Sequence, residues 1–103
     1  MNAFAALADP TRREIVELLA GGERSAGEIA GQFPMSRPGI SRHLRVLREH
    51  GLVRFREQGQ RRLYSLDAGP LAELDEWLER YRRFWTNRLD ALDTEIRRRR
   101  RAT

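Results

Sequence analysis

The sequence predicts a mainly helical protein with a small β-hairpin, and three observations lead to this fold class. Helix-capping residues recur along the first half of the chain, beginning with Asp9-Pro10. Two short segments that alternate apolar and polar residues lie on either side of Gly59, as in a β-hairpin. A long segment with apolar residues at helical spacing follows from Pro70. At 103 residues, the chain has the length of one domain.

The composition is that of a soluble globular protein, with 34% charged and 40% hydrophobic residues. The absence of cysteine excludes disulfides, thiolate metal sites and cysteine nucleophiles. No apolar stretch approaches the roughly 18–20 residues of a membrane helix, and the first residues do not resemble a secretory signal, so we expect a cytoplasmic protein. No phosphate-binding glycine loop, activated nucleophile or carboxylate pair is evident, so neither an enzyme nor a cofactor is expected.

Three helices are expected at the start of the chain. A short apolar helix should cover residues 2–8. The pair Asp9-Pro10 provides the N-cap and the first position of a second helix, which Gly21-Gly22 ends. A capping box at residues 25–28 opens the third helix, and Pro34 is expected to stop it.

The fourth helix has two chemically distinct faces. Ser36 can cap this helix, which should run from about Arg37 to His50. Its apolar residues, at i, i+4 and i+7, are expected to point into the core: Ile40, Leu44 and Leu47. The other face carries Arg37, Ser41, Arg42, Arg45 and Arg48. Two short helices joined by residues 34–36, the second strongly basic, are the sequence form of a helix-turn-helix.

The basic face indicates binding to DNA. A recognition helix presents its N-terminal residues to base edges in the major groove, so Arg37, Ser41 and Arg42 are the candidates for base contacts. Arg45 and Arg48 lie further along and more readily meet phosphate. Residues 36–62 hold eight of the 20 basic residues and two of the 15 acids, as expected where one face meets a polyanion. The alternative is an ordinary amphipathic surface helix whose arginines meet only solvent.

The second half of the chain predicts a hairpin and one long helix. Strands are expected at residues 52–56 and 62–66, around a loop at residues 57–60 that is longer than a two-residue turn. The helix should run from near Pro70 to about Ile96. Its apolar residues follow a heptad-like spacing that is interrupted only at Arg88. They are Leu71, Leu74, Leu78, Tyr81, Trp85, Leu92 and Ile96, widened on one flank by Trp77, Phe84 and Leu89.

The arginine tract from Arg97 to Arg101 ends the predicted helix, because like charges four residues apart repel one another. We therefore expect a domain over residues 1–96 and a flexible basic tail over residues 97–103. Whether this tail touches DNA stays open, since a solvated terminus explains it equally well.

Four stretches together resemble the ArsR-type winged helix-turn-helix repressors. They are residues 7–12 (LADPTR), residues 36–47 (SRPGISRHLRVL), Gly51-Leu52-Val53 and Tyr64-Ser65-Leu66. The resemblance covers about residues 3–96. It implies a homodimer in which the first and last helices pair. It also implies a recognition helix in the major groove and a hairpin wing at the DNA backbone or minor groove.

The resemblance assigns the remaining candidate residues. The wing candidates are Arg54, Arg56, Gln60, Arg61 and Arg62, and those that alternate with Phe55 toward solvent are favoured. Ser36 and His43 complete the DNA-binding set, with His43 as either a packing or a phosphate-contacting residue. The expected dimer interface contains Phe4, Leu7, Leu74, Trp77, Leu78, Tyr81, Trp85, Leu89 and Leu92.

The sequence departs from the metal-sensing members of this family. Many of them bind metals through a cysteine pair on the helix before the turn, or through acids and histidines on the last helix. Here residues 28–32 contain no cysteine and the last helix contains no histidine, so these kinds of metal sensing are not expected. His43 and His50 are seven residues apart and can share a helix face, but the resemblance favours a packing or phosphate-contacting role for His43 over metal binding. Residues 77–85 resemble a branch of the family that lacks metal ligands.

The sequence therefore indicates a sequence-specific repressor that binds double-stranded DNA as a homodimer at an inverted repeat. Two alternatives stay open: a non-specific architectural DNA-binding protein, and a winged helix that docks another protein. The sequence does not specify the operator or the regulated genes. A small-molecule inducer between the aromatic residues of two copies stays an open alternative.

Overall fold

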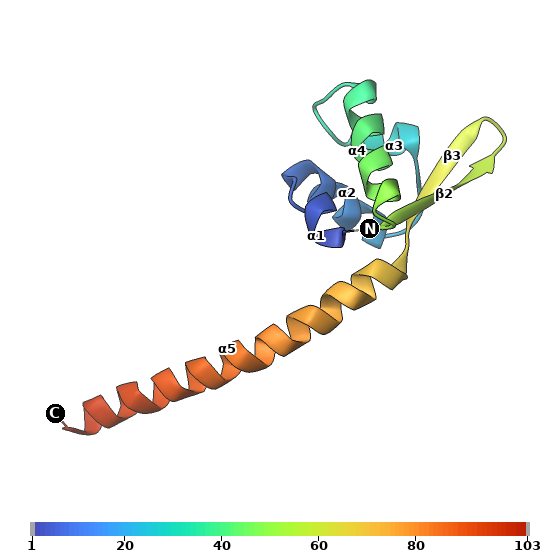
Figure 1. The fold of residues 1–103 in the computed structure, drawn as a ribbon. Coiled ribbons are helices and arrows are strands. Elements are labelled where there is room, and N and C mark those ends of the chain that lie inside the picture. The colour runs from blue at the N-terminus through green and yellow to red at the C-terminus, as the bar shows by residue number, and fades with distance from the viewer. Residues whose placement is uncertain (1, 103) are drawn as a thin grey trace. The chain divides into compact units, whose positions relative to one another are not determined.

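The computed structural model describes residues 2–102, and Figure 1 shows the order of its elements. These are α1 (Ala3–Ala6), α2 (Pro10–Ala20), β1 (Arg24–Ser25), α3 (Ala26–Gly31), α4 (Arg37–Glu49), β2 (Val53–Gln58), β3 (Arg61–Leu66) and α5 (Ala68–Ala102). Two compact units are present, the first ending at Ala72 and the second beginning at Glu73. The predicted fold class, helices with a small hairpin wing, is confirmed. None of the helices within residues 2–102 is long and apolar enough to cross a membrane.

Side chains form the predicted caps at the starts of α2 and α3. A carboxylate oxygen of Asp9 accepts hydrogen bonds from the backbone N–H groups of Thr11 and Arg12, at 2.8 and 3.1 Å. Before α3, Ser25 Oγ accepts from the Glu28 N–H at 3.1 Å, and Glu28 Oε1 accepts from the Ser25 N–H at 3.2 Å. These reciprocal bonds satisfy amide groups that the helix itself leaves without a partner.

Helix α3 ends earlier than predicted. Its last residue is Gly31, and Gln32 is its C-cap, so the helix stops before Pro34 rather than at it. The N–H groups of Gln32 and Phe33 bond to carbonyls three residues back, which tightens the last turn. A proline also disfavours helical backbone angles in the residue before it, and this restriction falls on Phe33.

The sheet has one more strand than predicted, and its order is β1-β3-β2. Strand β1 pairs antiparallel with β3, with Arg24 opposite Tyr64 and Ser25 opposite Leu63. A strand of two residues has no alternation that sequence analysis can detect. This short strand matters for the fold, because it joins the segment between α2 and α3 to the wing.

The wing is longer, and its turn tighter, than the sequence suggested. Strands β2 and β3 stay paired out to Gln58 and Arg61, which leaves only Gly59 and Gln60 as the turn. Gly59 has φ of +62°, which suits the first central position of a type II′ turn. The prediction of a longer loop was wrong because residues 57 and 58 are exposed on both faces of the hairpin, where polar residues extend a strand without an apolar signal.

The core of the first unit lies where the helices meet the sheet. It contains Ala6, Ile15, Leu19, Ile29, Ile40, Leu44, Leu47, Leu52, Val53 and Tyr64. The three residues of α4 that were predicted to face the core are all among them. Burial of this side of α4 fixes which residues of the helix face solvent.

Helix α5 carries an exposed apolar stripe in the second unit. Its large side chains are between 38% exposed (Leu78) and 61% exposed (Leu89). Neighbouring rings pack along the helix, with the ring centroids of Trp77 and Tyr81 4.7 Å apart and those of Phe84 and Trp85 5.8 Å apart. The predicted seam residues from Trp77 to Ile96 are thus exposed on one helix, whereas Leu71 packs against the core of the first unit.

Helix α5 continues to Ala102, beyond the predicted end near Ile96. Arg97 pairs with Asp93 and Arg99 pairs with Glu95, both at 3.1 Å. These i, i+4 pairs, together with the favourable position of arginines at a helix C-terminus, oppose the repulsion within the tract. The division into a domain and a flexible tail at residue 96 stays a prediction.

Candidate nucleic-acid interface

Helix α4 presents a basic face to solvent. Ser36 caps the helix, and its Oγ accepts a hydrogen bond from the Gly39 N–H at 3.3 Å. Ile40, Leu44 and Leu47 are at most 1% exposed. The opposite face, which is exposed, carries Arg37, Ser41, Arg42, Arg45 and Arg48. The two-faced helix that the spacing predicted is therefore present.

Three exposed arginines carry charge that no acid offsets locally. Within residues 2–102, no carboxylate forms an ion pair with Arg42 or Arg45 of α4, or with Arg54 of β2. Arg54 is on the face of β2 opposite to the half-buried Phe55, as the alternation predicted. A polyanion can bind these three guanidinium groups without first breaking an ion pair.

Two other wing arginines are already paired. Arg56 forms a bidentate ion pair with Glu23, with Nε–Oε2 and Nη2–Oε1 distances of 3.0 and 2.8 Å. Arg61 donates to Glu28 Oε1 at 3.0 Å. The hydrogen bond from Arg56 lowers the pKa of Glu23, and the hydrogen bonds from Ser25 lower that of Glu28. Both acids therefore stay ionised, and they hold the wing against the segment that precedes α3 and against α3 itself.

A phenylalanine connects the recognition helix to the wing. The guanidinium carbon of Arg48 lies 5.0 Å from the centre of the Phe55 ring, and that of Arg62 lies 4.6 Å from it. Both distances are within the range of cation–π attraction. Phe55 therefore holds one arginine of α4 and one of β3 near each other.

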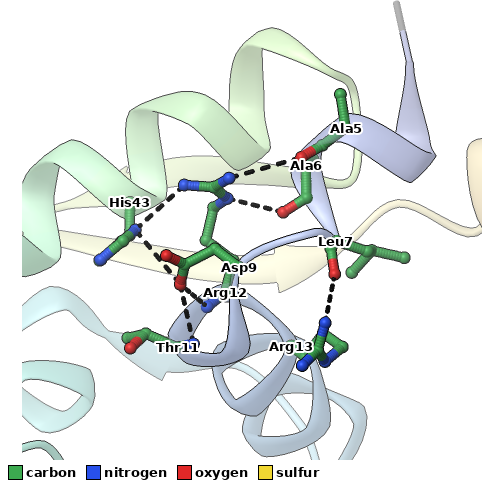
Figure 2. Close-up of polar contacts among 8 residues, drawn as sticks. All are labelled: Ala5, Ala6, Leu7, Asp9, Thr11, Arg12, Arg13 and His43. Atoms are coloured by element: carbon green, nitrogen blue, oxygen red, sulfur yellow. Dashed lines mark hydrogen bonds and ion pairs between the residues drawn. The ribbon is translucent and has the colours of Figure 1, made fainter.

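A polar network connects α1 and α2 to α4 (Figure 2). Arg12 donates from Nε to the Ala6 carbonyl at 2.6 Å and from Nη2 to the Ala5 carbonyl at 3.4 Å. Its third nitrogen lies 3.4 Å from His43 Nδ1. The same ring nitrogen is 4.0 Å from the Asp9 carboxylate. Arg12 thus ties the end of α1 to the middle of the recognition helix.

This network determines the charge of Asp9 and the exposure of His43. Burial by itself raises the pKa of Asp9, but the amide hydrogen bonds from Arg12 and Thr11 and the charges of His43 and Arg12 together lower it. The His43 side chain is only 16% exposed. Its contacts are those of a packing residue, and its role toward phosphate stays a prediction.

The second histidine also has an intramolecular partner. His50, the C-cap of α4, accepts a hydrogen bond at Nδ1 from the Asn2 N–H at 3.0 Å. Within residues 2–102, no three histidine, aspartate or glutamate side chains are grouped so that they could hold a metal ion. The segment around α1 is therefore connected to α4 at two points: through Arg12 to His43 in the middle of α4, and directly to His50 at the end of α4.

A groove of about 380 Å³ lies between α3, α4 and the turn of the wing. Arg37, Arg61 and Arg62 line it, and Ser41 and Gln60 add a hydroxyl and an amide. The remaining lining comes from Ser25, Ala26, Gly27, Ala30, Ile40 and Leu44. A Cβ atom added to Gly27 would lie 3.2 Å from Nη2 of Arg37, so this guanidinium rests close to the backbone of α3.

The structure thus brings most of the predicted DNA-binding residues to α4 and the wing, while the predicted dimer residues lie on other elements. Phe4 and Leu7 are in or next to α1, and Leu74, Trp77, Leu78, Tyr81, Trp85, Leu89 and Leu92 are on α5. Sequence analysis missed the acids that hold Arg56 and Arg61. Each of these pairs spans 33 residues, so no local spacing reveals it.

Comparisons with known proteins identify the helix-turn-helix segment. The family described as a helix-turn-helix domain matches residues 7–55. The HTH-type transcriptional regulator Rv2034 of Mycobacterium tuberculosis is 51% identical over 88 residues, which cover 85% of this chain and 79% of that protein. The transcriptional repressor SdpR of Bacillus subtilis is 42% identical over 77 residues, which cover 75% of this chain and 86% of that protein.

Solved structures give the same picture. A possible transcriptional regulator for arsenical resistance aligns with a TM-score of 0.74 and 42% identity, covering 92% of this chain and 96% of that one. An ArsR-like transcriptional regulator from Rhodococcus sp. RHA1 aligns with a TM-score of 0.68 and 37% identity, covering 86% and 84%. An ArsR family transcriptional regulator aligns with a TM-score of 0.71 and 32% identity, covering 81% and 86%.

Proposed function

The chain belongs to the ArsR family of winged helix-turn-helix transcriptional regulators, which bind DNA, and from this premise we propose that it is a homodimeric repressor of an inverted-repeat operator. The observation that carries the proposal is the division of α4 into a buried apolar side and an exposed side with four arginines. Two such helices, related by the twofold axis of a dimer, would enter successive major grooves about one helical turn apart.

We assign base readout to Ser41 and Arg42. Both are exposed near the start of α4, and Arg42 has the length to form a bidentate contact with guanine. Arg45 and Arg48, further along the helix, are assigned to phosphates. Arg37, which the sequence makes a candidate for base contact, lies close to the backbone of α3 at Gly27, and we assign it to the DNA backbone.

In the wing, Arg54 is assigned to direct contact with DNA because it has no acidic partner within residues 2–102. Arg56 is assigned an anchoring role, since its bidentate pair with Glu23 holds the wing in place. Gln60, at the exposed tip of the hairpin, is placed to enter the minor groove. In these assignments Arg56 anchors the wing, and Arg54 and Gln60 contact DNA.

We propose that the exposed apolar stripe of α5 pairs with α1 and α5 of a second copy. The exposed rings of Trp77, Tyr81, Phe84 and Trp85 follow one another along α5, and contiguous exposed apolar side chains of this kind mark protein–protein interaction sites. Pairing would bury these rings together with Phe4, which is 51% exposed. The dimer would work without a metal ion or enzymatic activity, and it would act in the cytoplasm.

The base-reading assignment is tested by comparing two arginines one turn apart on α4. The operator would be identified by selection from a random duplex library, and affinity for operator and random DNA would be measured by fluorescence anisotropy. Arg42→Ala should lower the ratio of specific to non-specific affinity by roughly 10-fold or more. Arg45→Ala should weaken binding to both DNAs equally. Equal effects of the two variants on the ratio would contradict the assignment.

The same experiment separates the alternatives. Equal affinity of the unaltered protein for every duplex would identify an architectural DNA-binding protein. No binding to any duplex at low salt would favour a protein-docking role.

The dimer is tested by Trp85→Ala, with Arg83→Ala on the opposite side of α5 as the control. Mass measurement in solution should give a dimer for the unaltered protein and for the control, and a monomer or unfolded chain for Trp85→Ala. A dimer of unchanged stability in the Trp85→Ala variant would show that the stripe is not the interface.

A further inference from the structure

The groove between α3, α4 and the wing turn has a chemistry that favours an anion. Its three guanidinium groups belong to Arg37, Arg61 and Arg62, and one of them, that of Arg61, is paired with the carboxylate of Glu28. Among residues 2–102, neither Arg37 nor Arg62 has an ion-pair partner. Guanidinium groups suit phosphate oxygens in particular, because two parallel N–H donors match their spacing.

The position of the groove indicates which anion it meets. Helix α4 forms one wall and the wing turn forms another. If α4 occupies the major groove and the wing reaches the adjacent minor groove, the DNA strand that separates these two grooves must pass between them. The apolar floor, which includes Ala26 and Ala30, offers a surface for the deoxyribose of that strand.

Glu28 is fixed in place by its own helix. Its Oε1 atom accepts one hydrogen bond from the Ser25 N–H at 3.2 Å and another from Arg61 at 3.0 Å. The capping box holds the carboxylate of Glu28 toward its own helix. Arg61 reaches Glu28 through Nη2, so a phosphate that binds this nitrogen must displace it from Glu28.

We propose that this groove seats one phosphate of the DNA backbone between Arg37 and Arg62, and that Glu28 competes with the DNA for Arg61. The proposal rests on the DNA-binding function and adds to it a specific phosphate site with a built-in competitor. Glu28 therefore weakens binding to every DNA sequence equally, and it does so through Arg61 alone.

The competitor is tested by a double-mutant cycle. The probe is a fluorescein-labelled 30-base-pair duplex of random sequence, titrated by anisotropy at several salt concentrations. Glu28→Gln keeps a capping acceptor but removes the charge, so it should tighten binding about 2- to 5-fold, the range expected for one exposed ion pair. In an Arg61→Gln background the same change should have almost no effect.

Glu57→Gln is the matched control, because Glu57 is an exposed acid of the wing that forms no ion pair with Arg61 or any other arginine within residues 2–102. It should change affinity by the same factor with and without Arg61. A gain from Glu28→Gln that persists in the Arg61→Gln background, or that equals the gain from Glu57→Gln, would mean that Glu28 acts only through the general field and would overturn the competition.

The phosphate seat is tested by the salt dependence of the same probe. Each phosphate that the protein neutralises contributes about 0.9 to the slope of log affinity against log salt. If Arg37 and Arg62 share one phosphate, either arginine alone still neutralises it, so Arg37→Gln and Arg62→Gln should each lower the slope by much less than about 0.9, and the double variant should lower it by about 0.9. A loss of about two in the double variant, or no loss, would overturn the seat while the DNA-binding function stands. Absence of binding by the unaltered protein would overturn both.

Discussion

Replacing Arg12 by alanine should destabilise the first unit far more than the same change at its neighbour Arg13. Arg12 bonds to two carbonyls of the α1 segment and to a histidine of α4, whereas Arg13 donates a single exposed hydrogen bond to the Leu7 carbonyl at 2.9 Å (Figure 2). The two residues have the same side chain and lie on the same helix. They therefore separate the effect of the network from the effect of one positive charge.

The size of the loss follows from the contacts. The bond from Arg12 Nε to the Ala6 carbonyl is 2.6 Å long and partly buried, and a hydrogen bond with a charged donor contributes about 1.5–3 kcal/mol. The two contacts of Arg12 at 3.4 Å add less. Arg12→Ala should thus lower the free energy of unfolding by about 2–3 kcal/mol. Arg13→Ala should cost less than half of that, because water replaces its exposed bond.

Urea denaturation followed by circular dichroism measures both losses. Protein concentration must be the same in all samples, since the stability of a dimer depends on it. Arg12→Lys is a useful third variant: it keeps the charge, but one ammonium group cannot reach all three partners, so its loss should be intermediate. Equal losses for Arg12→Ala and Arg13→Ala would refute the reasoning.

Two further predictions concern acid stability and turn geometry. Because the pKa of Asp9 is lowered in the folded protein, its ionised form stabilises the fold above the ordinary value of 3.8, and this contribution is lost as the pH falls below that value. Between about pH 4 and pH 2, denaturant titrations should show a smaller loss of the free energy of unfolding in Asp9→Asn than in the unaltered protein, because asparagine still caps α2 but does not titrate. Identical losses in the two proteins would exclude Asp9 as a source of acid sensitivity. Gly59→Ala meets no atom within 4 Å but must adopt φ of +62°, so it should cost roughly 1 kcal/mol, seen as a lower melting temperature. Gly31→Ala, equally unhindered at the end of helix α3, should leave stability unchanged or raise it, and a shared sign for the two glycine variants would contradict the role of φ.

Features with a local cause were predictable from the sequence. Asp9-Pro10 and the capping box at residues 25–28 determine helix starts through bonds to amides two or three residues away. The faces of α4 follow from the spacing of Ile40, Leu44 and Leu47. For the same reason the exposed basic side of α4 could be described before its position in the fold was known.

Features that depend on distant partners were not predictable. The pairing of β1 with β3 joins residues about 40 positions apart, and two residues are too few to show an alternating pattern. The ion pairs of Arg56 with Glu23 and of Arg61 with Glu28 also join residues far apart in the sequence, so no local pattern reveals them. From the sequence, only alternation with Phe55 distinguished the wing arginines as candidates for DNA contact. Their partners divide them into an anchor, an arginine that must exchange its acid for phosphate, and arginines that are available at once.

Strand β1, although it contains two residues, has a consequence for how sequence is recognised. By hydrogen bonding to β3 it fixes the wing to the segment that leads into the helix-turn-helix, so the distance between recognition helix and wing is set before DNA is met. A protein whose two reading elements are rigidly spaced makes the DNA adapt, and the energy of that adaptation depends on the local stiffness and minor-groove width of the duplex. Selected operators should then share preferences at base pairs that no side chain reaches.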